Sequence, residues 1–461
     1  MLREKSALDQ IQAEPYIASA DPPGRVNLLG KYSGLSMQKH RSDHLIRHSL
    51  LLLAASQATN VANFFFHFFM GRMLTPVEYG SLVSMLGLLM FVGIPLGALS
   101  NSLAFCSAKL LEEGHAGAIR PFMRRWFGKV MIAGVLIVVL GIVLCPATIS
   151  FFQLQRPSTF LIAIVVLGLS LFGPVLGGIL QGVQAFVWSA VSGIIGTGVR
   201  IIVSVALVYW LGRISDWAII GHGMGVLAGL LIGAGSIIWI FKDTIPVQAD
   251  KKIAGYFFSS LVILAGFSFM MNADVLIVKH FFSPEESGLF ARAATIGRMI
   301  IFLPMPIAGA LFPKIVAAGG IGGQQKRLLI RGTLLAGAII VAAAGVGSVI
   351  PQLPLWLIYH DVHPSETMIR LVRCMLWAMS PLSLAYIVMN YHMAQSRFNV
   401  LFLLPLCALF YLAGVVMWHA SVFQIVAVLA ASNLAGLTVL LIGLPWRNVK
   451  PAESAAPQAV R

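Results

Sequence analysis

The chain has 461 residues, of which 58% are hydrophobic and only 11% are charged. This composition excludes an ordinary soluble domain and indicates an integral membrane protein. A formal net charge of +15 is compatible with nucleic-acid binding only if the basic residues form a patch or stripe, but here they fall between apolar stretches. We therefore expect a membrane partner and no nucleic acid.

The first 45 residues are polar, rich in Pro, Gly and Ser, and lack the apolar core of a signal peptide. We expect residues 1–45 to form a disordered cytoplasmic tail. The sequence GRVNLLGKYS in this tail is similar to a phosphate-binding loop. It has five residues between Gly24 and Gly30 where the motif has four, and a tyrosine at position 32 where the motif has Ser or Thr, so we do not expect it to bind a nucleotide. The four cysteines share no close spacing, so we expect no metal site and no cofactor.

Apolar stretches long enough to cross a bilayer follow the tail, and they predict an all-α membrane protein of about twelve transmembrane helices. The twelve predicted spans are 46–71, 80–110, 126–145, 158–182, 186–211, 217–241, 256–282, 288–318, 328–350, 366–392, 399–418 and 421–445. They form two lobes of six spans around a central cavity, 46–241 and 256–445. A cytoplasmic linker, 242–255, joins the lobes, and residues 446–461 form a second cytoplasmic tail.

The distribution of basic residues predicts the orientation. Most of the 32 Lys and Arg residues lie in the tails and in alternate connections on one side. The opposite side has only Arg72, Arg156, Arg213 and Lys279. The positive-inside rule therefore places both termini in the cytoplasm.

A repeated motif indicates an internal duplication. TPVEYG, residues 75–80, and SPEESG, residues 283–288, are 208 positions apart, and each is predicted to start a helix with a capping box. Gly173-Pro174 and Ser380-Pro381 repeat at an offset of 207. Two six-span halves with one orientation are typical of lobes that rock about a central cavity.

Two segments carry a family resemblance. NADVLIVKHFFSPEESGLFARAATIGRM and its weaker echo NFFFHFFMGRMLTPVEYGSLVSMLGLL resemble the span-loop-span signature of the multidrug, oligosaccharidyl-lipid and polysaccharide (MOP) exporter superfamily. Twelve spans, and QGVQAF after the fourth, are similar to its Wzx-type polysaccharide flippase branch. The resemblance implies a non-enzymatic flippase of the bacterial inner membrane. Its substrate would be a polyprenyl-diphosphate-linked oligosaccharide, and its partners a polysaccharide polymerase and a chain-length regulator.

Ionisable residues within predicted spans identify candidate site residues, because they are costly when they face lipid. Arg298 and Asp274 lie about 15 Å and 12 Å from the outer ends of sequential spans, so they are level and able to pair. Arg200 reaches a similar depth, and Arg370 and Arg373 share a face three residues apart. The resemblance also implies a functional aspartate at Asp274, a candidate for ion coupling, and a basic residue in the next span.

The balance of these charges favours an anionic substrate. The predicted spans contain five arginines but only one clearly intramembrane carboxylate. A phosphate-bearing substrate suits this excess of arginine, because guanidinium groups bind phosphate oxygens bidentately. Two bland alternatives stay open. In the first, Arg292 and Lys279, which lie near outer boundaries, extend their side chains to the lipid headgroups and bind no substrate. In the second, Asp274 and Arg298 form an ion pair that has only a structural role.

Neutral polar residues line three predicted helices at helical spacing. They are Ser56, Asn60, Asn63 and His67 in the first span, Ser268 and Asn272 in the seventh, and Ser383, Tyr386 and Asn390 in the tenth. Such stripes bind sugar hydroxyls, and they equally serve helix packing in membranes. Prolines at 95, 174, 304, 306 and 381 predict kinks.

Other functions stay open at this point. A cation-coupled multidrug exporter of the same superfamily is disfavoured by the single intramembrane acid. A lipid II flippase is disfavoured by the span number, since that branch usually has fourteen. A membrane-embedded sugar polymerase or transferase is disfavoured by connections too short for a separate catalytic domain.

Overall fold

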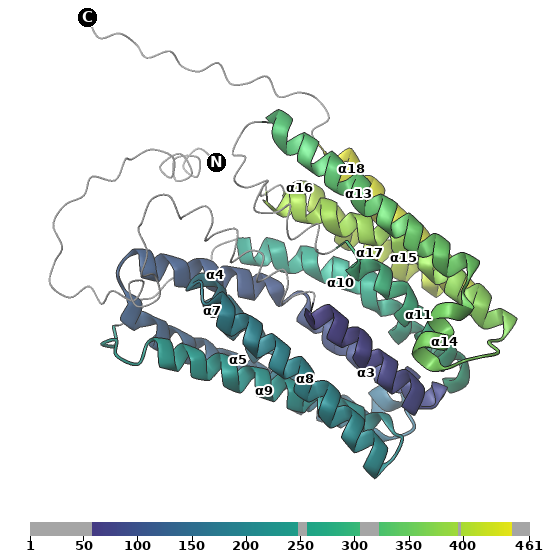
Figure 1. Cartoon of the computed structure of the whole chain (residues 1–461), viewed down its shortest axis with the longest axis horizontal. Helices are drawn as coiled ribbons and strands as arrows, with labels where there is room; N and C mark the ends of the chain where they lie inside the picture. The colour runs from purple at the N-terminus through teal and green to yellow at the C-terminus, as the bar shows by residue number, and fades with distance from the viewer. Residues whose placement is uncertain (1–57, 248–255, 305–321, 395–397, 445–461) are drawn as a thin grey trace, which may run out of the picture. The chain divides into compact units, whose positions relative to one another are not determined.

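A computed structural model describes residues 58–247, 256–304, 322–394 and 398–444, all within one compact unit, Ile46–Arg461. Regular structure in these ranges is helical throughout (Figure 1). A first helix covers 58–73. The others are α3 Pro76–Gly93, α4 Gly97–Glu112, the 3-10 turn η1 Ala116–Ala118, α5 Ile119–Phe151, α6 Pro157–Ser170, α7 Phe172–Gly182, α8 Phe186–Leu211, α9 Ser215–Ile240, α10 Tyr256–Phe281, α11 Pro284–Phe302, α13 Gly322–Val349, α14 Gln352–Tyr359, α15 Glu366–Ala394, α16 Phe398–Leu401, α17 Leu403–Met417 and α18 Val422–Ile442.

Ten helical segments of the described residues are long and apolar enough to cross a membrane, and each coincides with a predicted span. Phe186–Leu211 matches its prediction residue for residue. The first predicted span begins outside the described residues. The eighth is represented by α11, where two glutamates and two arginines interrupt the apolar run, and its continuation also lies outside the described residues. The predicted tails and most of the predicted linker are outside them as well.

Prolines account for two of the breaks between helices. The second predicted span is divided into α3 and α4, and Pro95 lies at the break. The fourth is divided into α6 and α7, and Pro174 lies in the first turn of α7. Because proline lacks an N–H and its ring crowds the preceding turn, it favours such a break. Pro381, by contrast, lies inside the continuous helix α15, as Pro146 does in α5.

The repeated motifs of the two halves meet in space. Helix α3 packs against α10 and α11, and α4 packs against α10. At the contact between α3 and α11, a β-carbon added to Gly80 would lie 2.9 Å from the α-carbon of Gly288. One added to Gly288 would lie 2.3 Å from the carbonyl oxygen of Pro76. The final glycines of TPVEYG and SPEESG therefore permit a backbone approach that no other residue allows.

Helix α14 was not predicted from the sequence, because its eight residues lie in a connection between spans. It lies beside α11 near the start of α3 (Figure 1). Arg72 donates from Nη2 to the carbonyl oxygen of Leu357 at 2.8 Å. A β-carbon on Gly71 would lie 2.6 Å from the ring of Tyr359. Helix α14 therefore joins the second half of the chain to the helix over 58–73.

Candidate functional site

The predicted pair of Asp274 and Arg298 forms a buried ion pair. Asp274 of α10 is fully buried and Arg298 of α11 is 7% exposed. The guanidinium donates from Nη2 to Oδ1 of Asp274, and from Nε to the carbonyl oxygen of Met271 at 3.0 Å. The two helices are joined by a short turn, so residues at equal depth on facing sides come together. The pairing is confirmed, whereas its part in transport stays a prediction.

Polar atoms around this ion pair lack partners of their own. The Oδ2 atom of Asp274 and the Oδ1 atom of Asn272 are buried without a hydrogen bond. The hydroxyl of Tyr411, on α17, is also buried without one and interacts electrostatically with Asp274 and Arg298. A buried carboxylate with one free oxygen is costly as an anion. The charge of the Asp274 carboxylate is offset by its ion pair with Arg298.

Arg200, on α8, is a second cationic residue within a predicted span and is partly buried. Its Nη1 donates to Oδ1 of Asn63 at 2.8 Å, and its guanidinium carbon lies 3.7 Å from the ring centroid of Phe66. Its Nε is buried without a partner. In the part of the chain that the structure describes, no carboxylate pairs with Arg200. His67 and His222 are close enough to interact with it electrostatically.

A chain of hydrogen bonds crosses between the halves next to this position. His67 Nδ1 lies 3.0 Å from the hydroxyl of Tyr79, which donates to Oγ1 of Thr295 at 3.2 Å. The hydroxyl of Tyr359 lies 3.1 Å from that of Tyr79. Burial raises the pKa of Tyr359 well above its ordinary value, so this hydroxyl stays protonated. His67 was the only predicted member, because the others are far apart in the sequence.

Of the two residues expected to reach the headgroups, Lys279 is buried. Lys279 is 1% exposed, its Nζ has no hydrogen-bond partner, and Glu78 and Glu285 are near enough to interact with it electrostatically. The guanidinium of Arg292 lies 5.0 Å from the ring centroid of Tyr359. The snorkelling prediction was wrong for Lys279, because α10 carries its last turn into the contact between the halves rather than to the surface.

Arg370 and Arg373 do not form one cationic surface. Both are exposed on α15. Arg370 lies 5.4 Å from the ring centroid of Phe423, on α18, whereas Arg373 Nε donates to the carbonyl oxygen of Ser348, on α13, at 2.9 Å. Residues three apart on a helix differ by about 60° in direction. Since α15 packs against both α13 and α18, this difference directs the two arginines to different neighbours.

The predicted polar stripes are largely engaged in helix contacts. Ser383 donates to the carbonyl oxygen of Ile300 at 2.9 Å, joining α15 to α11, and Ser268 bonds to α3. Within single helices, the amides of Asn272 and Asn390 donate to the carbonyl oxygens of Ser268 and Tyr386. The Nδ2 atom of Asn60 is buried without a hydrogen bond.

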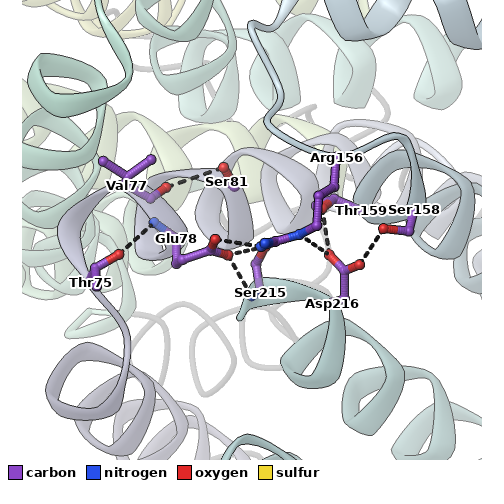
Figure 2. Close-up of polar contacts among 9 residues, drawn as sticks. All are labelled: Thr75, Val77, Glu78, Ser81, Arg156, Ser158, Thr159, Ser215 and Asp216. Atoms are coloured by element: carbon purple, nitrogen blue, oxygen red, sulfur yellow. Dashed lines mark hydrogen bonds and ion pairs between the residues drawn. The ribbon is translucent and has the colours of Figure 1, made fainter. Parts of the chain in front are cut away.

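A cluster of opposite charges, which the sequence did not reveal, joins three helix N-termini in the first half (Figure 2). Glu78 of α3 accepts from Arg156 and, through Oε2, from the backbone N–H of Ser215 at 2.7 Å. Asp216 accepts from the hydroxyls of Ser158 and Thr159, both at 2.5 Å. Ser215 begins α9, and Arg156 is the N-cap of α6. Carboxylates are stabilised at the positive ends of helix dipoles.

This cluster corrects the prediction of two equivalent capping boxes. In the second half, Ser283 and Glu286 form the full reciprocal box. In the first half, Oγ1 of Thr75 accepts from the N–H of Glu78, but the glutamate does not return to its own N-cap. Its carboxylate is held by Arg156 and Ser215 instead.

Comparison with known proteins gives a likeness of fold. No protein-family model matches the sequence, and no curated protein matches it. An inward-facing MATE-family multidrug resistance transporter of the MOP superfamily has a TM-score of 0.69 and 12% identity, covering 86% of this chain and 96% of that one. The lipid II flippase MurJ, inward closed, has a TM-score of 0.62 and 12% identity, covering 85% of this chain and 87% of that one.

A third similar structure concerns binding-site charge. It is a MOP superfamily transporter from Pyrococcus furiosus, for which reversed polarity of the binding pocket suggests a different function. The TM-score is 0.58 at 14% identity, covering 86% of this chain and 93% of that one. The chain is therefore a multi-pass helical membrane protein with the fold of MOP superfamily transporters.

Proposed function

We propose that this protein is a flippase that moves a polyprenyl-diphosphate-linked oligosaccharide from the cytoplasmic to the periplasmic leaflet of a bacterial inner membrane. A MOP-type fold supports membrane transport as the general activity. The diphosphate is the part of such a substrate that a buried cation recognises, because guanidinium groups pair with phosphate oxygens through two parallel hydrogen bonds.

The proposal depends on the observation that no carboxylate pairs with Arg200 in the described part of the chain. The intramembrane carboxylate, Asp274, is already neutralised by Arg298. Among the residues that the structure describes, Arg200 contacts the amide oxygen of Asn63 and the face of Phe66 and has no carboxylate partner. A guanidinium whose Nε is buried without a hydrogen bond is costly, and an anionic ligand removes that cost. The free protein is therefore prepared for an anion at Arg200.

The neutral and acidic residues take separate parts in this proposal. Asn60, Asn63 and His67 lie on the helix that faces Arg200, and in this proposal they would bind sugar hydroxyls when the substrate is present. Asp274 biases the equilibrium between the two states of the transporter when Oδ2 takes up a proton or a cation. A polymerase and a chain-length regulator would receive the flipped substrate.

Proteoliposomes test the assignment. A fluorescent polyprenyl-diphosphate oligosaccharide is loaded, and its exposure in each leaflet is followed with a membrane-impermeant quencher. We expect flipping by the wild type and at least a tenfold slower rate with Arg200→Gln. Arg213→Gln, an exposed arginine in the turn after α8, is the matched control and is expected to keep the wild-type rate.

Other substrates in the same vesicles distinguish the remaining functions. Transport of a cationic dye without flipping of the labelled lipid would contradict the proposal and indicate a multidrug exporter. Flipping restricted to a lipid-linked muropeptide would indicate a lipid II flippase. Equal flipping rates of the wild type and Arg200→Gln would show that Arg200 does not bind the substrate.

A further inference from the structure

Helix α9 brings a second polar side chain, His222, close to Arg200 of α8. The two helices pack tightly at this level, because a β-carbon on Gly225 would lie 2.6 Å from the β-carbon of Arg200. His222 lies three residues before Gly225 and is therefore directed about 60° away from it, near the face of α9 that meets α8. The imidazole is close enough to interact with Arg200 electrostatically. Histidine and arginine are therefore neighbours within the first half of the chain.

The guanidinium of Arg200 keeps one edge for a ligand. Its Nη1 donates to Oδ1 of Asn63 at 2.8 Å, and its flat face covers the ring of Phe66. Its Nε is buried without a hydrogen bond, and Asn63 is its only hydrogen-bond partner among the described residues. Nε and Nη2 form one side of the planar group, and such an edge binds two phosphate oxygens in parallel. The contacts with Asn63 and Phe66 thus leave the edge of Nε and Nη2 for an anion.

His222 also has a nitrogen that the protein does not use. Its Nδ1 is buried without a hydrogen bond. Because neutral imidazole carries its proton on either nitrogen, an anion beside Nδ1 selects the form with the proton on that atom. His67 is also near Arg200, but its Nδ1 lies 3.0 Å from the hydroxyl of Tyr79 and already has a partner. Of the two histidines, His222 is therefore the one whose Nδ1 is available to a ligand.

The charges around His222 favour an anion over a cation. Arg200 is the nearby charged residue on α8. The nearest acid along α9 is Asp216, about 9 Å away along the helix axis. Its two carboxylate oxygens accept from the hydroxyls of Ser158 and Thr159. A cation between His222 and Arg200 would therefore meet a positive charge, whereas an anion would be attracted by the guanidinium.

We infer, resting on the proposed function, that His222 is a second binding residue for the phosphate-bearing headgroup. The imidazole donates from Nδ1, while Arg200 donates from Nε and Nη2. One ligand would then satisfy both nitrogen atoms that are buried without hydrogen bonds in the free protein, and it would connect α8 to α9. Inorganic diphosphate shares this chemistry, whereas only a lipid also has an apolar chain.

Ligand binding to the full chain in detergent tests the role of His222. The probe is farnesyl diphosphate, and farnesol is the comparison that lacks phosphate. We expect His222→Leu to bind farnesyl diphosphate about tenfold more weakly than the wild type, because one hydrogen bond to a charged group is lost. Binding of farnesol should not change. His222→Asn keeps an amide N–H close to the position of Nδ1, so we expect it to stay within about threefold of the wild type.

His363→Leu is the matched control. His363 is exposed in the turn before α15, so the same substitution there is expected to leave the affinity for farnesyl diphosphate unchanged. Unfolding temperatures measured without ligand establish that every variant is folded. A loss of binding confined to His222→Leu then reports on the imidazole and not on the stability of the protein.

Four results would overturn the assignment of His222. Equal affinities of the wild type and His222→Leu, with weak binding by Arg200→Gln, would exclude His222 and leave the proposed function intact. Equal losses in His222→Leu and His222→Asn, or a parallel loss of farnesol binding, would indicate a packing role. Displacement of the probe by inorganic diphosphate at equal concentration would indicate a site for a free anion. Wild-type protein that binds farnesyl diphosphate no better than farnesol would contradict the proposed function itself.

Discussion

Gly80 and Gly288 occupy equivalent positions in the two copies of the repeated motif, and their backbones touch. A β-carbon on Gly80 would approach the α-carbon of Gly288 to 2.9 Å. The repeated phrase therefore serves the contact between the halves as well as the start of each helix. The glycine is required by this contact, because a side chain in either copy would meet the backbone of the other.

Gly288→Ala is expected to weaken the contact between α3 and α11. The added methyl group would lie 2.3 Å from the carbonyl oxygen of Pro76, and neither backbone can yield without separating the helices. We expect a loss of about 1–3 kcal/mol in the free energy of unfolding, measured in detergent. Gly345→Ala is the control, because a β-carbon there meets open space within α13. Equal effects of the two substitutions would contradict the prediction.

Glu78→Gln is expected to destabilise the first half. The substitution removes the charge that faces Arg156 and weakens the acceptor for the N–H of Ser215. Because Arg156 is partly exposed and keeps access to water, we expect a cost of about 2 kcal/mol rather than that of a fully buried pair. Glu286→Gln, at the equivalent exposed position of α11, should cost less than about 1 kcal/mol. Thermal unfolding of both variants in detergent tests this, and equal losses of stability in Glu78→Gln and Glu286→Gln would contradict the prediction.

Asp274→Asn is expected to reduce flipping more than it reduces protein level. The variant leaves Arg298 buried without its counter-ion, so some loss of stability is expected as well. The apolar double replacement Asp274→Leu and Arg298→Met separates the two effects. We expect it to recover stability but not flipping. Recovery of flipping to the wild-type rate would show that the ion pair is purely structural.

Tyr79 and Tyr359 provide a test of the hydrogen-bond chain between the halves. Each change to Phe removes one hydroxyl from a buried contact of 3.1 Å, at an expected cost of about 1 kcal/mol. A double-mutant cycle on the free energy of unfolding should give a coupling of about 0.5–1 kcal/mol. Strictly additive effects would indicate that the two hydroxyls do not interact.

Much of the fold could be predicted from the sequence, because a bilayer requires long apolar helices and hydropathy reports them directly. The ten observed segments coincide with predicted spans for this reason. Asp274 and Arg298 were predictable as a pair because they belong to one helical hairpin, in which depth along the chain determines which residues are level.

The polar cluster around Glu78 could not be predicted in the same way. Its acids and bases lie at 78, 156 and 216, and only tertiary packing brings the N-termini of α3, α6 and α9 together. The sequence instead predicted a capping box from the spacing of Thr75 and Glu78. A local motif identifies the donor that is nearest along the chain, here the N–H of Thr75, whereas the folded protein gives the Glu78 carboxylate the donors of Arg156 and Ser215. Helix α14 was missed because eight residues carry too little periodicity.

The Glu78 cluster also links α3 to the other helices of the first half. This helix touches α10 and α11 of the second half, yet its first turn is bound by charged hydrogen bonds to α6 and α9. The corresponding glutamate of α11, Glu286, bonds only to its own N-cap. Through Glu78, α3 is therefore tied to α6 and α9, whereas in the described residues Glu286 makes no such bond from α11 to another helix. The first turns of the two motif copies therefore differ in how they are joined to neighbouring helices.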